Sequence, residues 1–270
     1  ANRGFGTVTV GGLSGGDALT MNCLFIGHKI ESPPDDAMVP TVVNCTFFDE
    51  PQGIVPTPLT SYASCVSTFD LVSGNRGGLT FGESMYSLYP DTDNNPDPDG
   101  PGNVHVLPQF LRNPDHGGDG WGDDPLTSDI DESANDDYGD LRLVPGSPAI
   151  DAGTNTAVPP DFADLDNDGD TTEPTPFDFA GNPRFLDDPN SPDTGVGPAP
   201  IADMGAYEFD GTCSVADLAT PRDMLDMADV MAFVDAFDAA DARADLALPF
   251  GLFDLADVLA FVDAFGAGCP

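Results

Sequence analysis

The sequence predicts a mainly β protein: a short right-handed parallel β-helix with a loop-rich cap, followed by a small α-helical domain. Three observations predict this fold class. Similar short segments recur about every 20 residues, the chain is rich in aspartate, glycine and proline, and a tighter repeat with helical periodicity lies near its end. We expect coils over residues 1–95, acidic loops and the terminal cap over 96–210, and the helical module over 211–270.

Three cysteines mark the first repeat. Cys23, Cys45 and Cys65 each lie in a short segment of alternating character, and they are spaced 22 and 20 residues apart. In a parallel solenoid each coil pairs only with its neighbours and repeats its inward residue. The spacing therefore predicts stacked strands whose thiols form a buried ladder rather than a metal site. Segments 6–10 and 85–89 extend the pattern to roughly five coils, enough for a stable solenoid.

The composition excludes several classes of function. The chain has 8 basic and 47 acidic residues, which gives a net charge of −39, and 41 of the acids are aspartate. Nucleic acids and anionic membranes are bound through clustered Lys and Arg, so neither is an expected partner. Long uninterrupted apolar runs are missing, so we expect no membrane insertion. The hydrophobic content of 40% predicts a folded core, and the self-repulsion must be relieved by salt, protons or divalent cations.

The long acidic stretch before residue 140 holds the only tryptophan, Trp121, which sits among glycines and acids. An exposed aromatic ring in such a loop could stack on a sugar, and the alternative is that it packs back onto the protein. We expect packing.

The clearest metal signal lies at residues 164–175. Aspartates occupy positions 1, 3 and 5 and Gly169 occupies position 6, as in the front half of an EF-hand loop. The back half departs, because position 12 is Thr175 and flanking prolines forbid the usual helix. The closing ligand is then Glu173 or Asp178, and the alternative is a solvated acidic turn. The acids that we predict to bind Ca²⁺ here are Asp164, Asp166, Asp168, Asp170 and Glu173.

The second repeat occupies the C-terminal segment. Its two copies begin at Asp217 and Asp245, 28 residues apart, and 14 of 21 aligned positions are identical. From Val230 onward apolar residues recur at i, i+3, i+4 and i+7, which predicts an amphipathic helix in each copy. Asp229 and Asp257 lie near the two helix starts, where a carboxylate favours both the free amides and a cation.

This duplicated unit resembles a dockerin, the paired loop-helix calcium module that binds cohesins, in a variant that ends Gly268-Cys269-Pro270. The resemblance implies two calcium sites and a cohesin-like partner. Carried over by position, the implied ligands are Asp217, Asp226 and Asp229 for one ion and Asp245, Asp254 and Asp257 for the other. Alanine and proline replace two usual oxygen ligands in each loop, so the alternative is an apolar helix pair whose aspartates are only caps.

Cys213 and Cys269 bracket the repeat, and we expect a disulfide between them. Such a bridge would contribute roughly 4 kcal/mol to a small domain in the chain-entropy model. It also implies an oxidising location, outside the cell or at its surface.

The repeated Asn-Cys-x-Phe coils, together with segments 145–153 and 203–209, resemble the closing part of bacterial secreted right-handed β-helix proteins. The resemblance implies secretion and a β-helix, but no particular reaction, because that fold serves enzymes, adhesins and passive stalks alike.

The few basic residues form no recognisable catalytic constellation, so we predict no catalytic residue. We expect a secreted, calcium-stabilised structural or adhesive protein of a surface or matrix. Because residues 1–10 read as part of a coil, either further coils precede them or the open edge stacks head-to-tail on another copy, giving filaments. A cohesin-like protein, another copy or an extracellular polysaccharide is the expected partner. The alternative is a carbohydrate-active lyase, hydrolase or glycan-binding module, because an inverting glycosidase needs only paired carboxylates.

Overall fold

The computed structural model describes residues 8–9, 19–26, 30–31, 41–48, 61–68, 84–90, 100–118, 120–121, 135–248 and 250–269. The chain forms two compact units, each built from two separate stretches of sequence. The strand unit comprises Ala1–Pro108 and Gly146–Glu208, and the helical unit comprises Gln109–Pro145 and Phe209–Pro270. The segment 96–210, expected as one cap region, is therefore divided between the two units.

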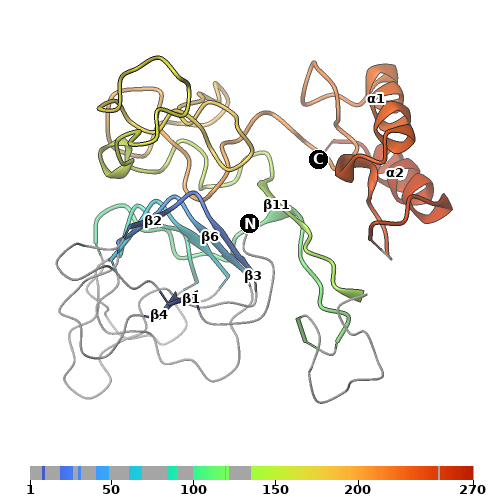
Figure 1. The fold of residues 1–270 in the computed structure, drawn as a ribbon, viewed down its shortest axis with the longest axis horizontal. Coiled ribbons are helices and arrows are strands. Elements are labelled where there is room, and N and C mark those ends of the chain that lie inside the picture. Colours follow the sequence, from blue (N-terminus) through green and yellow to red (C-terminus); the bar gives the residue numbers. More distant parts are fainter. Residues whose placement is uncertain are drawn as a thin grey trace. The chain divides into compact units, whose positions relative to one another are not determined.

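Short parallel strands stack in the strand unit (Figure 1). One sheet has the order β2 (Leu19–Met21), β5 (Thr41–Val43), β7 (Ser61–Ala63), β9 (Ser84–Met85). A second has the order β3 (Leu24–Ile26), β6 (Thr46–Phe48), β8 (Val66–Ser67). Every pairing in both sheets is parallel, and neighbouring strands are 20 or 22 residues apart in register, as Thr20 with Val42 and Val42 with Tyr62. This confirms the parallel stacking that the cysteine spacing predicted.

The coil-like segments on either side of this stack also join the pattern. β1 (Val8–Thr9) pairs in parallel with β4 (Ile30–Glu31), again at a step of 22 residues. At the other side Leu88 forms parallel bridges to Val66 and to Val104. The repeat thus extends in both directions from the cysteine-containing strands.

One residue between the two sheets turns the chain in each repeat. Asn22, Asn44, Ser64 and Tyr86 all have left-handed backbone conformations, with φ of 49°, 49°, 51° and 46°. Asparagine tolerates this region better than most residues, because its short polar side chain can bond locally. The backbone N–H of Asn22 donates to the carbonyl of Val43, and the backbone N–H of Asn44 donates to the carbonyl of Ala63. These residues, called the corner residues below, place the following residue of each repeat in the core.

The core of the strand unit is a stack of cysteine and aromatic side chains. Its fully or largely buried members are Phe25, Val42, Cys45, Phe47, Cys65 and Tyr89. The ring of Phe25 lies 4.8 Å from that of Phe47 at an interplanar angle of 8°. The three cysteines are free thiols, and burial raises the pKa of Cys65 to about 12. Cys45 and Cys65 are buried, which confirms the predicted ladder for these two, whereas Cys23 is only partly buried and packs against the cluster.

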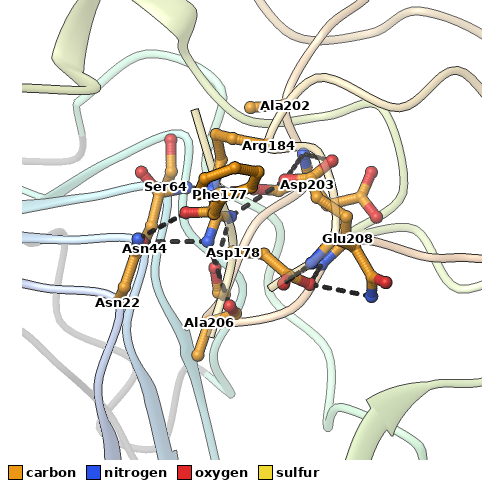
Figure 2. Close-up of polar contacts among 12 residues, drawn as sticks. Asn22, Asn44, Ser64, Phe177, Asp178, Arg184, Ala202, Asp203, Ala206 and Glu208 are labelled. Carbon is orange, nitrogen blue, oxygen red and sulfur yellow. Dashed lines mark hydrogen bonds and ion pairs between the residues drawn. The ribbon is translucent and has the colours of Figure 1, made fainter. Parts of the chain in front are cut away.

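The segment 146–208, called the cap below, contacts three of the corner residues, Asn22, Asn44 and Ser64 (Figure 2). The side-chain amide of Asn44 donates to the carbonyl of Asp203 (3.2 Å), and Ser64 Oγ accepts from the amide of Thr154 (2.8 Å). One short 3₁₀ turn, η2 (Asn155–Ala157), lies in this segment. The cap contains few regular elements, as expected for a chain so rich in proline, glycine and aspartate.

A fully buried ion pair fixes the cap to the strands. Arg184 and Glu208 are both 0% exposed, and Arg184 Nη1 donates to Glu208 Oε1 at 2.9 Å. Arg184 Nη2 donates to Asn22 Oδ1 (2.9 Å) and to the carbonyl of Ala206 (3.0 Å), so the guanidinium joins cap and corner (Figure 2). Burial and nearby Asp203 raise the pKa of Glu208 well above its usual range, although Arg184 acts in the opposite direction.

The helical unit contains an antiparallel pair of strands and two helices. β10 (Phe110–Arg112) and β11 (Asp140–Leu143) pair antiparallel. The helices are α1 (Met227–Asp238) and α2 (Leu255–Ala267), with a 3₁₀ turn η3 (Ala242–Ala244). The rings of Phe233 and Phe261 stack 4.1 Å apart, which confirms that the two repeats pack their apolar faces together. Val234, the i+4 member of the predicted stripe, is instead 56% exposed. No helix among the described residues has the length and apolarity needed to cross a membrane.

Two side-chain predictions are settled in this unit. Cys213 and Cys269 form a disulfide across 56 residues, as expected. Trp121 is 7% exposed, stacks on Tyr138 with centroids 5.8 Å apart and meets the ring of His116 edge-on. The tryptophan therefore packs within the protein and offers no open face to a sugar.

Candidate metal centres

The acidic loop at residues 161–173 brings together four of the five calcium ligands predicted for it. Asp164, Asp166 and Asp168 each place a carboxylate oxygen within 4.8 Å of the other two. Two ligands held 2.3–2.6 Å from one Ca²⁺ can be up to about 5 Å apart, so these three oxygens could share one ion.

Turns formed by the aspartates themselves shape the loop. Asp164 Oδ1 accepts from the amide of Gly169 (3.1 Å), and Asp166 Oδ1 accepts from the amide of Asp168 (3.2 Å). Asp164, Asn167 and Gly169 have positive φ of 50°, 61° and 88°. Glycine at the last of these positions carries no Cβ penalty, which is the role expected of position 6 in such a loop.

A second group overlaps the first and includes an acid that the sequence reading missed. Carboxylate oxygens of Asp161, Asp166 and Glu173 also lie within 4.8 Å of one another. Asp161 is buried, its Oδ2 accepts from the amide of Leu165 (2.6 Å), and its own amide donates to the carbonyl of Glu173 (2.8 Å). Asp161 lies three residues before the EF-hand-like pattern, so spacing alone could not identify it.

Glu173 shows how strongly these carboxylates repel one another. Burial, followed by the charges of Asp168, Asp170 and Asp166, raises the pKa of Glu173 to about 7. Its Oε1 is buried and makes no hydrogen bond. A bound cation would reverse this repulsion, because a metal ion is the largest local charge in its site.

The fifth predicted ligand, Asp170, belongs to neither group. Its Oδ1 accepts from the amide of Thr172 (2.9 Å) and from Thr172 Oγ1 (2.7 Å), and these bonds lower the pKa of Asp170. Asp170 thus ends a turn, while four of the five predicted acids belong to the two groups.

The acids of the first helical repeat are arranged differently. Asp229 Oδ1 accepts from the amides of Leu218 and Ala219, both at 2.8 Å. Its Oδ2 accepts from the amide of Asp226 (2.8 Å), while Asp226 Oδ1 accepts from the amide of Ala228 (2.6 Å). Asp226 and Asp229 therefore form a reciprocal capping box at the start of α1.

The second repeat reproduces this geometry. Asp257 Oδ1 accepts from the amides of Leu246 (2.7 Å) and Ala247 (2.9 Å), and its Oδ2 accepts from that of Asp254 (2.9 Å). Asp254 caps α2 through the amide of Ala256 (2.7 Å). The carboxylates of Asp229 and Asp257 are fully buried in these contacts.

The first acid of each repeat has one oxygen that accepts no hydrogen bond, and in Asp217 this oxygen lies 3.7 Å from Arg222 Nη1 in an ion pair. Asp217 Oδ2 accepts from the amides of Cys213 and Asp223, and Asp245 Oδ2 accepts from that of Gly251 (2.7 Å). The Oδ1 atoms of Asp217 and Asp245 are buried and make no hydrogen bond. Burial raises the pKa of Asp217.

Neither implied dockerin triad forms a group of converging acid oxygens in the described chain. Asp217 converges instead with the sulfurs of Cys213 and Cys269, which are bonded to each other and so present no thiolate to a metal. The capping contacts match the alternative reading of the helical repeats, and calcium binding there stays a prediction.

No family model matches this chain, and no curated protein or solved structure matches it either.

Proposed function

We propose that this protein is a secreted, calcium-stabilised, non-catalytic structural or adhesive component of a cell surface or extracellular matrix. The observation that carries the proposal is the constant parallel register of the strand unit, in which each pairing advances by 20 or 22 residues. Such a stack is a quasi-one-dimensional scaffold that can be lengthened without changing its cross-section. The finer fold that we propose for it is a right-handed parallel β-helix.

The edges of the stack supply the means of assembly. β2 and β3 each stand at the end of their sheet among the described residues. An edge strand presents unpaired backbone groups that template pairing with another strand. Head-to-tail addition of a second copy would be heterologous and non-closing, and would give a filament.

The two remaining parts of the proposal concern calcium and the helical module. The acid groups of the loop at 161–173 suit calcium because their ligands are all carboxylate oxygens. The disulfide-closed repeat resembles a dockerin in sequence and supports a role as connector, to a cohesin-like protein or to the next subunit.

The test of assembly is electron microscopy and light scattering of the purified protein over a calcium series. The proposal predicts filaments or ladders of oligomers whose length depends on calcium and protein concentration. Monodisperse single copies at every calcium concentration would remove self-assembly, and secretion is checked by localising the protein in the producing cells.

One observation favours a second function, a carbohydrate-active enzyme. Glu173, whose pKa is raised to about 7, has a carboxylate oxygen within 4.8 Å of those of Asp161 and Asp166, an arrangement that resembles a general acid beside a second carboxylate. Release of reducing ends or unsaturated products from a panel of acidic and neutral polysaccharides tests it. Activity that disappears in Glu173→Gln but survives in Asp170→Asn would favour the enzyme over the structural protein.

A further inference from the structure

A separate set of carboxylates lies where the cap closes on itself, outside the acidic loop and the helical repeats. Asp151, Asp187 and Asp193 each place one carboxylate oxygen within 4.8 Å of the other two. Asp151 is fully buried, whereas Asp187 and Asp193 are exposed. The group therefore has one buried acid at its base and two that face solvent.

The backbone of Asp151 is fixed on both sides. Its amide donates to Asp203 Oδ1 (2.7 Å), and its carbonyl accepts from the amides of Thr194 (2.9 Å) and Gly195 (3.0 Å). Asp151 also has a φ of 50°, a conformation that a non-glycine residue holds only when its surroundings impose it. The side chain is thus held in one direction by the packed residues around it.

Only one oxygen of the Asp151 carboxylate accepts a hydrogen bond from the protein. Its Oδ2 accepts one weak hydrogen bond from the amide of Asp188 (3.3 Å), while its Oδ1 is buried and makes none. A buried polar atom without a partner is rare in native proteins and destabilises the fold. This atom points to a ligand that completes the site.

The charges around Asp151 point the same way. Three carboxylates so close together repel one another unless a cation or a proton intervenes.

We propose that Asp151, Asp187 and Asp193 bind a divalent cation of the calcium class. Oxygen separations within 4.8 Å match ligands at 2.3–2.6 Å from one ion, and carboxylates from an exposed loop leave positions for water. Ca²⁺ suits this arrangement better than Mg²⁺, which demands near-ideal octahedral geometry. The ion joins the loop 187–193 to the buried turn at 147–151.

This cation fixes the loop that follows Arg184. The amide of Val196 donates to the carbonyl of Gly153 (3.0 Å), and Thr154 forms a parallel bridge to Val196. The site lies at the start of this short ladder, so an ion at Asp151 holds the two chain segments in register. The role is structural and independent of assembly, of glycan binding and of the acidic loop.

The test counts the calcium ions bound by the full-length protein, by equilibrium dialysis and metal analysis. Asp187→Asn/Asp193→Asn is the informative variant, because both side chains are exposed and Asp151 keeps its contact with Asp188. Asp235→Asn/Asp263→Asn is the matched control, with the same charge change at exposed helical positions outside every acid group. Asp166→Asn/Asp168→Asn removes two carboxylates of the acidic loop instead.

We expect Asp187→Asn/Asp193→Asn to bind one calcium ion fewer than the control, or to bind that ion at least tenfold more weakly. Calcium should also slow hydrogen exchange at the amides of Thr194 and Gly195 in the control and not in this variant. Equal stoichiometry and affinity in the two variants would overturn the proposal. Loss of an ion in Asp166→Asn/Asp168→Asn alone would place calcium in the acidic loop and likewise overturn it.

Discussion

In the acidic loop at 161–173 carboxylates gather around one another, whereas in the two helical repeats each carboxylate is surrounded by backbone amides. Asp164, Asp166 and Asp168 converge within 4.8 Å, but Asp229 and Asp257 each accept three amide hydrogen bonds from their own chain. The same residue type therefore fills two physical roles in one protein. An acid satisfied by amides contributes to stability by itself, and an acid facing other acids is repelled by them unless a cation or a proton offsets the charge.

The buried pair of Arg184 and Glu208 adds a third way to satisfy a carboxylate, and it gives the largest expected effect. Arg184→Met should destabilise the strand unit by about 3–5 kcal/mol, because it leaves Glu208 buried without its cationic partner and removes the contact to Asn22. Urea unfolding followed by circular dichroism measures this change.

The matched control for this prediction is Arg243→Met. Arg243 pairs with Asp241 at 2.9 Å, but its side chain is 64% exposed, so the loss should be below about 1 kcal/mol. Equal effects of the two substitutions would show that the buried pair does not hold the cap on the corner residues.

The next largest effect concerns a carboxylate that accepts hydrogen bonds from backbone amides. Asp257→Ala should destabilise the helical unit by roughly 3 kcal/mol, because three amides lose a charged acceptor. The loss should be the same in calcium and in chelator if the carboxylate acts only as a cap. Thermal unfolding in both conditions measures it, with Asp263→Ala, on the exposed face of α2, as the control within about 0.5 kcal/mol of wild type.

The parallel stack, the two helices and the disulfide could all be predicted from the sequence. The spacing of Cys23, Cys45 and Cys65 predicted the parallel stack, because a repeat needs only local pattern and neighbour pairing. The apolar stripe from Val230 predicted the helices, and the bracketing cysteines predicted the bridge.

Long-range contacts within the cap lay beyond sequence reasoning. Arg184 meets Asn22 across 162 residues, and Asp151 meets Asp187 and Asp193 only because the cap turns back on itself. No periodic pattern links such positions. For the same reason the sequence did not show that the strand pair that joins Phe110 to Leu143 belongs to the helical unit.

The acidic loop should behave in the opposite way to Asp257. Asp166→Asn/Asp168→Asn removes repulsion, so in chelator the strand unit should keep or slightly gain stability, by up to about 1 kcal/mol. In calcium the variant should lack the part of the stabilisation that an ion in this loop supplies to the wild type, which at 100 times the dissociation constant is about 2.7 kcal/mol. Thermal midpoints of wild type and variant, each with and without calcium, decide the point. A variant as strongly stabilised by calcium as the wild type would show that the loop is only a solvated turn.

The smallest effect concerns pH. The folded-state pKa of Glu208 is raised above its unfolded value of about 4.3, so its contribution is fully present below that pH and is lost as pH rises through the folded pKa. Relative to Glu208→Gln, the wild type should therefore lose stability steadily above about pH 4.3. Urea unfolding of both proteins in chelator across this range tests the sign, and a difference that stays constant or grows with pH contradicts it.

The bridge between Cys213 and Cys269 makes the segment that carries both helices a closed ring. A protease that cuts this ring once, between α1 and α2, releases nothing, because the fragments stay covalently attached. Shedding the second helix requires a further cut or a reductant. The helical repeats can therefore survive nicking that would detach the end of an open chain, and such damage is visible on a gel only after reduction.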